Sequence, residues 1–162
     1  MTKPRATELP LDTDTLVAGV FEAPDYADRF AIACDPERHR TVDDVATDWF
    51  TRQPRWVRLL STNSLSTTGV ERAIAEGGYR VGSAVGSWAV FERSDDEIVF
   101  GDSLGFMEFR TAFRLPPDRP GTAEAATVVR YRWRRTGRFY FALVRPMHRR
   151  FIPSLLERTV GT

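Results

Sequence analysis

The segment from Gly137 to Thr159, GRFYFALVRPMHRRFIPSLLERT, constrains the fold of this chain more than any other. At 3.6 residues per turn it forms a helix with an apolar stripe on one side and arginines on the other. The stripe comprises Tyr140, Leu143, Val144, Met147, Phe151, Ile152 and Leu155. Pro146 and Pro153 fall on the outer face, so a bend at either would curve the helix around the layer it covers. The sequence therefore predicts a long amphipathic helix packed on another layer.

The segments before this helix alternate between apolar and charged residues, which is typical of antiparallel strands with one buried face. From 106 to 115, one face carries Met107, Phe109, Phe113 and Leu115, and the other carries Glu108, Arg110, Ala112 and Arg114. From 122 to 135, Val129, Tyr131 and Trp133 alternate with Arg130, Arg132 and Arg134. Residues 83–93 and 97–102 read as a hairpin with a turn at 94–96. We expect a meander of antiparallel strands.

The first half of the chain predicts mainly one strand and short helices. Residues 29–34, RFAIAC, have the alternation of a strand. Thr41 stands three residues before Asp44, which is typical of a helix start. A second short helix is expected around Trp56, Leu59 and Leu60, and a further turn or two at 70–76. We expect a flexible tail at residues 1–14 and a single α+β domain at 15–162.

Composition excludes several classes of site and partner. Cys34 is the single cysteine and there are two histidines, so neither a disulfide framework nor a metal site is expected. No apolar run approaches a membrane span, and the first residues lack the apolar core of a signal peptide. We therefore expect a cytoplasmic protein with no membrane partner and no cofactor. A homodimer is compatible with the sequence.

Charge is unevenly distributed along the chain. Residues 1–48 hold eleven Asp and Glu against five Lys and Arg, whereas residues 130–158 hold nine arginines and one glutamate. Such a basic row raises nucleic acid as a partner. The arginines alternate along a strand or fall on the outer side of the helix, where solvated charge belongs, so the pattern disfavours nucleic-acid binding.

His148 is the leading candidate for a functional residue, because it falls within the apolar arc of the predicted helix. An imidazole directed at a core needs a partner, and it can move a proton near neutral pH. Arg145 could bind an enolate or carboxylate beside it, and Tyr140 lies on the same stripe. The alternative is a buried histidine that fixes the helix against the sheet.

Residues that could line a space between sheet and helix form a larger set. We expect it to contain Trp88, Phe106, Met107, Glu108, Phe109, Arg110, Tyr131, Trp133, Val144, Met147 and Phe151. Core packing is the alternative for the aromatic members. Glu108 and Arg110 could instead form an ion pair on the outer surface, and the sequence leaves open which face of their strand is directed at the cavity.

The order of elements resembles the helix-grip fold of the START-like, or SRPBCC, superfamily, in which a curved antiparallel sheet grips a long C-terminal helix. Four segments, PDYADRF, DWFTRQPRWVRLL, GSWAVFERSDDEIVFGD and GRFYFALVRPMHRRFIPSLLER, also resemble an uncharacterised bacterial domain family. Some members of that family follow short-chain-reductase-like domains. Where relatives are expected to carry a histidine, this chain has Phe106, which implies a more apolar cavity.

The resemblance implies a small hydrophobic or polyketide-like ligand bound between sheet and helix. Because the superfamily includes cyclases and aromatases, it further implies acid/base cyclisation or dehydration, with His148, Tyr140 and Arg145 as catalytic residues. The alternative is a non-enzymatic carrier or sensor of a small ligand, or a domain that assists a reductase.

Overall fold

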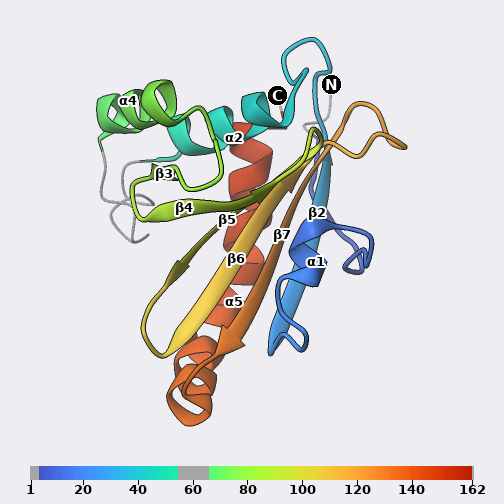
Figure 1. Ribbon diagram of the computed structural model, residues 1–162. Helices are drawn as coiled ribbons and strands as arrows, with labels where there is room; N and C mark the ends of the chain where they lie inside the picture. Colours follow the sequence, from blue (N-terminus) through green and yellow to red (C-terminus); the bar gives the residue numbers. More distant parts are fainter. Residues whose placement is uncertain (1–3, 55–65, 162) are drawn as a thin grey trace.

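The computed structural model describes residues 4–54 and 66–161. Its framework is a curved antiparallel sheet of seven strands in the order β1-β2-β7-β6-β5-β4-β3 (Figure 1). The strands are β1 (Thr7–Glu8), β2 (Tyr26–Ala33), β3 (Ala84–Val85), β4 (Trp88–Arg93), β5 (Glu97–Ser103), β6 (Met107–Arg114) and β7 (Thr122–Tyr131). Neighbours in sequence are neighbours in the sheet from β3 to β7, and β2 joins the free edge of β7. The predicted meander is confirmed.

The helices occupy both faces and one end of this sheet (Figure 1). They are α1 (Leu16–Gly19), α2 (Val42–Thr51), α4 (Thr67–Gly77) and α5 (Arg134–Thr159). The 26-residue helix α5 crosses one face and continues through both of its prolines. Helix α1 packs on the opposite face, against Val99, Ala112, Ala126 and Val128. The fold is therefore α+β with a curved antiparallel sheet and a C-terminal helix, as the sequence predicts at that level.

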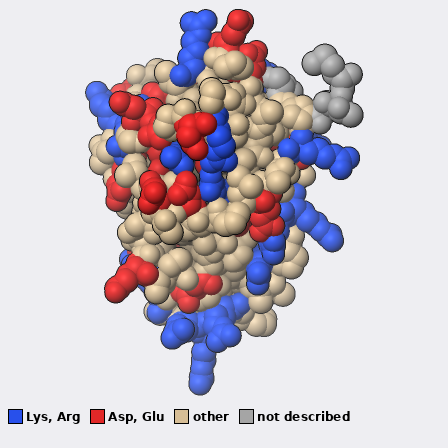
Figure 2. All heavy atoms as spheres, turned by 90° about the vertical axis from the view of Figure 1, so that its right-hand side faces the viewer, with Lys and Arg blue, Asp and Glu red and all other residues tan. Residues whose placement is uncertain are grey.

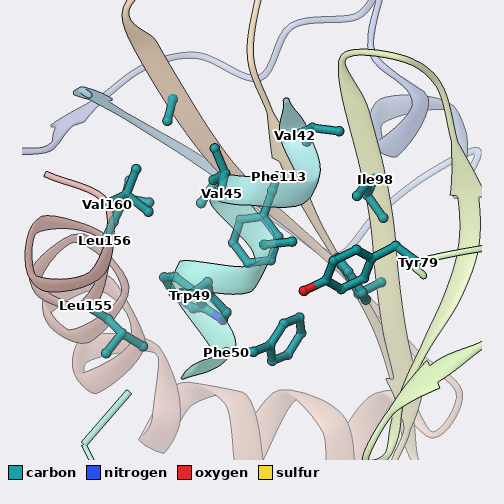
Figure 3. Close-up of a cluster of buried hydrophobic side chains, with 14 of the residues drawn as sticks. Val42, Val45, Trp49, Phe50, Tyr79, Ile98, Phe113, Leu155, Leu156 and Val160 are labelled. Carbon is teal, nitrogen blue, oxygen red and sulfur yellow. The ribbon is translucent and has the colours of Figure 1, made fainter. Parts of the chain in front are cut away.

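The main core lies between α2, the end of α5 and the inner face of the sheet (Figure 3). Thr41 caps α2 together with Asp44 in the reciprocal arrangement that the sequence predicts. Trp49 and Phe50 of this helix are buried and contact the ring of Phe113 on β6. This packing closes one end of the space under α5.

Helix α1 is held on the outer face by a buried carboxylate. The backbone N–H groups of Leu16 and Val17 donate to the two oxygens of Glu97 at 2.8 and 3.0 Å. Burial raises the pKa of Glu97, although these two hydrogen bonds act in the opposite direction. Thr7 and Glu8, within the predicted tail, form β1 on β2. The predicted helix around Trp56 lies outside the described residues.

Helix α5 begins at Arg134, earlier than predicted, and is rotated so that only part of the predicted apolar stripe faces the sheet. Its buried positions are Gly137, Phe141, Leu155, Leu156 and Thr159, with Val144, His148 and Ile152 half-buried between them. Leu143 and Met147 are 67% and 56% exposed, so the prediction that both face the core is wrong. The helix is rotated because glycine at 137 allows a close approach to the sheet and because the sheet offers His148 a charged partner.

Candidate functional site: a polar row under helix α5

A row of polar side chains crosses the inner face of the sheet beneath α5. Strand pairing places Asp28 of β2 beside Thr127 of β7, and Thr127 beside Thr111 of β6. All three residues are at most 4% exposed. The two threonine hydroxyls lie 3.3 Å apart. Polar groups in such a position need partners or a ligand, because water is excluded from them.

Asp28 is the charged end of this row and contacts the histidine of the helix. Its side chain is 1% exposed, and its Oδ2 lies 3.2 Å from Nδ1 of His148. At this distance the imidazole is not aligned for a hydrogen bond to Asp28. Within the described part of the chain, Oδ1 of Asp28 has no hydrogen-bond partner. The site therefore holds a buried carboxylate that is incompletely satisfied.

Tyr26 completes the group from the same strand. Its hydroxyl donates to Oδ2 of Asp28 at 2.6 Å, and its ring meets His148 edge-on with 6.0 Å between centroids. Burial and this hydrogen bond raise the pKa of Tyr26, so the phenol is a hydrogen-bond donor at neutral pH. The guanidinium of Arg145 lies over the same ring, 5.5 Å from its centroid.

An apolar cavity of about 210 Å³ adjoins this polar row between sheet and helix. Most of its wall is apolar, and the polar exceptions are His148, the hydroxyls of Thr111, Thr127 and Tyr140, and the indole of Trp88. The other lining residues are Leu104, Met107, Phe109, Val129, Phe141, Val144 and Ile152. The indole N–H of Trp88 is buried without a partner among the described residues. The cavity can thus take a mainly apolar molecule with one or two polar groups.

Of the residues predicted for this space, the structure brings together six. His148 and Tyr140 of the predicted catalytic set line the cavity, as do Trp88, Met107, Phe109 and Val144. The face of β6 that carries Met107 and Phe109 is the face turned toward α5. Arg145 lies outside the cavity, over Tyr26.

Glu108 and Arg110 do not line the cavity, because they point to the outer face of β6. Glu108 accepts hydrogen bonds from Arg130 and Arg132, and Arg110 stacks over the ring of Phe91 at 3.6 Å. The two arginines lower the pKa of Glu108. Glu108 therefore forms ion pairs with Arg130, its cross-strand neighbour on β7, and with Arg132 just after that strand, and not with Arg110.

Five further residues predicted for the cavity lie elsewhere. Trp133 is 66% exposed because β7 ends at Tyr131 and the chain turns into α5, so the predicted alternation does not continue. Phe106 packs its ring on Tyr140 outside the cavity. Met147 and Phe151 line a surface groove on the far side of α5. Tyr131 lines a separate hollow, described below.

Asp28, Tyr26, Thr111 and Thr127 were not predicted. The sequence predicts a strand at residues 29–34, whereas β2 begins at Tyr26. The signal was present, since Tyr26, Asp28, Phe30 and Ile32 are spaced by two and therefore share one face of a strand. The other histidine, His39, is 3% exposed, and its Nε2 lies 2.9 Å from Oδ2 of Asp48, away from this site.

No group of three or more His, Cys, Asp and Glu side chains in the described ranges could hold a metal ion. The described part of the chain also contains no helix both long and apolar enough to cross a membrane.

Comparison with known proteins places the chain in a family. A family model described as "Protein of unknown function (DUF2867)" matches residues 20–155, which include Asp28, His148 and the whole cavity wall. The chain belongs to the DUF2867 family. No curated protein and no solved structure matches it. The uncharacterised domain family suggested by the sequence is therefore confirmed, and the match to DUF2867 leaves the chemistry of the site to be argued from its residues.

Proposed function

We propose that this DUF2867 protein has the helix-grip architecture of the START-like superfamily and binds a small, mainly apolar molecule between the sheet and α5. The observation that carries the proposal is the contact between buried Asp28 and half-buried His148 beside an apolar cavity. A carboxylate at 1% exposure is costly to bury. A core that only had to pack would be at least as stable with apolar residues at these positions, so the pair favours a role beyond packing.

The size of the cavity sets the size of the ligand. About 210 Å³ is smaller than the roughly 300–1,000 Å³ of typical small-molecule pockets. A single ring or a short chain fits, and a longer polyketide-like molecule would place only one end inside. The wall offers aromatic and aliphatic contacts along with the hydroxyls of Thr111, Thr127 and Tyr140, which could orient a carbonyl or hydroxyl group of the ligand.

The reaction that fits this geometry is proton transfer at a carbon next to a carbonyl. Asp28 lies next to Nδ1 of His148, so it can favour a proton on that nitrogen and leave the other nitrogen as the base. When the imidazole takes the proton, the carboxylate stabilises the resulting cation. Tyr140, which lines the cavity, could donate a hydrogen bond to the developing enolate. Removal of such a proton opens both aldol-type cyclisation and dehydration.

A non-enzymatic carrier or sensor is the second candidate. Its supporting observation is the poor alignment of His148 with Asp28, which suits a residue that holds the helix on the sheet as well as it suits a base. An accessory role beside a reductase would use the same cavity.

Native mass spectrometry of the protein from its own host tests ligand binding first, because a retained small molecule identifies the substrate class. A chain that carries no small molecule, and that binds none from an extract of its host, contradicts the proposal. His148→Gln then separates the two candidates. An enzyme loses turnover by ~10²-fold or more with ligand affinity retained, because a general base is removed. A carrier keeps its affinity and shows no turnover in either form. The neighbouring Arg149→Gln, whose side chain is paired with Glu8 on the surface, is the matched control.

A further inference from the structure

A second hollow, of about 430 Å³, lies where α5 leaves the end of β7. Three arginines of α5 line it: Arg134, Arg138 and Arg145. Asp25 is the one acidic residue in its wall, so the wall carries three positive charges against one negative charge. Figure 2 shows basic side chains gathered at the lower end of the molecule, where α5 begins in Figure 1.

These three guanidiniums differ from the arginines of the sheet. On the outer face, Arg29 is paired with Glu124, and Arg130 and Arg132 share Glu108. Within the described residues, Arg134, Arg138 and Arg145 form no ion pair with a carboxylate. Solvated surface arginines are common, but three that converge on one hollow with a single carboxylate, Asp25, in its wall leave a positive potential there.

Tyr131 adds a hydrogen-bond donor to the same hollow. Tyr131 lines the hollow, and Gly137 of α5 packs on its ring so tightly that a Cβ at 137 would lie 2.7 Å from it. The hydroxyl of Tyr131 donates no hydrogen bond within the described part of the chain, so it is available to a ligand.

The hollow and the apolar cavity are neighbours. Phe141 lines both. Tyr26 lines the hollow, and its ring contacts His148, which lines the cavity. One layer of aromatic side chains thus separates the two spaces, so a single ligand that occupies both would pass beside Phe141, the residue that lines both.

We propose that this arginine hollow binds the phosphate group of the molecule whose apolar part occupies the cavity. The inference rests on the proposed function, and it narrows the substrate class to phosphate-bearing amphiphiles. A phosphate is favoured over a carboxylate because a phosphate monoester carries up to two negative charges, which matches the balance of the wall. Guanidiniums also bind phosphate oxygens in pairs.

The test uses three probes in NMR titrations at about 0.15 M salt: phenyl phosphate, inorganic phosphate and phenol. Arg138→Gln/Arg145→Gln removes two of the guanidiniums. Arg135→Gln/Arg150→Gln is the matched control, because both residues are exposed on α5 outside the hollow. The first pair of substitutions should lower the affinity for phenyl phosphate and for inorganic phosphate at least tenfold. This is the loss expected when one charge-assisted hydrogen bond disappears. The control pair should change the affinity less than twofold.

Four outcomes are informative. The inference is supported if both phosphates change the chemical shifts of amides 137–145 and if phenyl phosphate also changes those of amides 127–129. An equal loss of phosphate affinity in the two double variants overturns the inference, because the binding then depends on the net positive charge of α5 and not on the hollow. Phenol in the cavity without saturable phosphate binding also overturns it and leaves the proposed function intact. If phosphate binds at the arginines but neither aromatic probe changes the chemical shifts of the cavity amides, the anion site stands and the proposed function is overturned.

Discussion

Gly137→Ala is the substitution that most sharply tests how α5 sits on the sheet. Gly137 is buried in the first turns of α5. A Cβ added there would lie 2.7 to 2.8 Å from three atoms of the Tyr131 side chain. Carbon atoms in contact prefer about 3.5–4.0 Å, so helix and ring would have to separate by roughly 1 Å.

The expected magnitude follows from two opposing effects. Overpacking of this kind costs about 1–3 kcal/mol, whereas alanine gains up to about 1 kcal/mol over glycine inside a helix. Gly19→Ala is the matched control, because nothing lies within 4 Å of a Cβ at that position. It should be neutral or stabilising by up to about 1 kcal/mol. The two variants should therefore differ by about 1–3 kcal/mol in the free energy of unfolding.

Urea denaturation followed by circular dichroism measures this difference. With an m value near 2 kcal/mol/M, a difference of 2 kcal/mol separates the two midpoints by about 1 M. Gly137→Ala should also weaken phosphate binding, since the displaced turn carries Arg134 and Arg138. Equal midpoints for the two variants would refute the close approach of α5 to Tyr131, and with it the placement of the arginine hollow.

Two further predictions concern the outer face and the rotation of α5. Glu108→Gln should lower the free energy of unfolding by about 1–2 kcal/mol at pH 7 and by less towards pH 3. Arg132 and Arg130 lower the pKa of Glu108 in the folded protein. The stabilisation by the carboxylate is therefore complete above about pH 4.3 and is lost as the pH falls through the lowered pKa. Equal losses at both pH values, measured by urea titration, would argue against this pairing. Leu156→Ala, at a fully buried position, should cost about 2–5 kcal/mol, whereas Leu143→Ala, at 67% exposure, should cost under about 0.5 kcal/mol. The reverse order in thermal unfolding would mean that α5 turns its other side to the sheet.

The sheet and the position of α5 in the chain were predictable because they follow from local periodicity. Alternation from 106 to 115 assigned residues to the two faces of β6 correctly, and the capping pair Thr41 and Asp44 marked the start of α2. Both patterns are read within about ten residues. They depend little on what the segment packs against.

The side that α5 turns inward was not predictable from hydrophobicity alone. The predicted stripe includes Leu143 and Met147 at one margin, and both are exposed. The buried arc passes through Gly137 and His148, and its direction follows two contacts with the sheet: Gly137 packs on Tyr131, six residues earlier, and His148 meets Asp28, far away in sequence. Such contacts join residues about 120 positions apart in the case of Asp28 and His148, which a helical wheel cannot represent.

Half of the polar site was missed for a related reason. His148 was singled out because a histidine in an apolar arc is conspicuous. Its partner Asp28 was hidden in a segment whose proline and aspartates favour a turn, although β2 begins two residues before it. Asp28 nevertheless shares a strand face with Phe30 and Ile32, which is where an acid that partners an inward-facing imidazole is expected.

The most direct measurement of the central claim is the position of a small apolar probe on the protein. Isotope-filtered nuclear Overhauser spectra of the phenol complex report which side chains lie against the probe. Contacts to the methyl groups of Val129, Val144 and Ile152 are predicted, since all three line the cavity beside His148. Contacts confined to Leu143 and Met147, in the exposed groove on the far side of α5, would contradict a ligand site between the sheet and the helix.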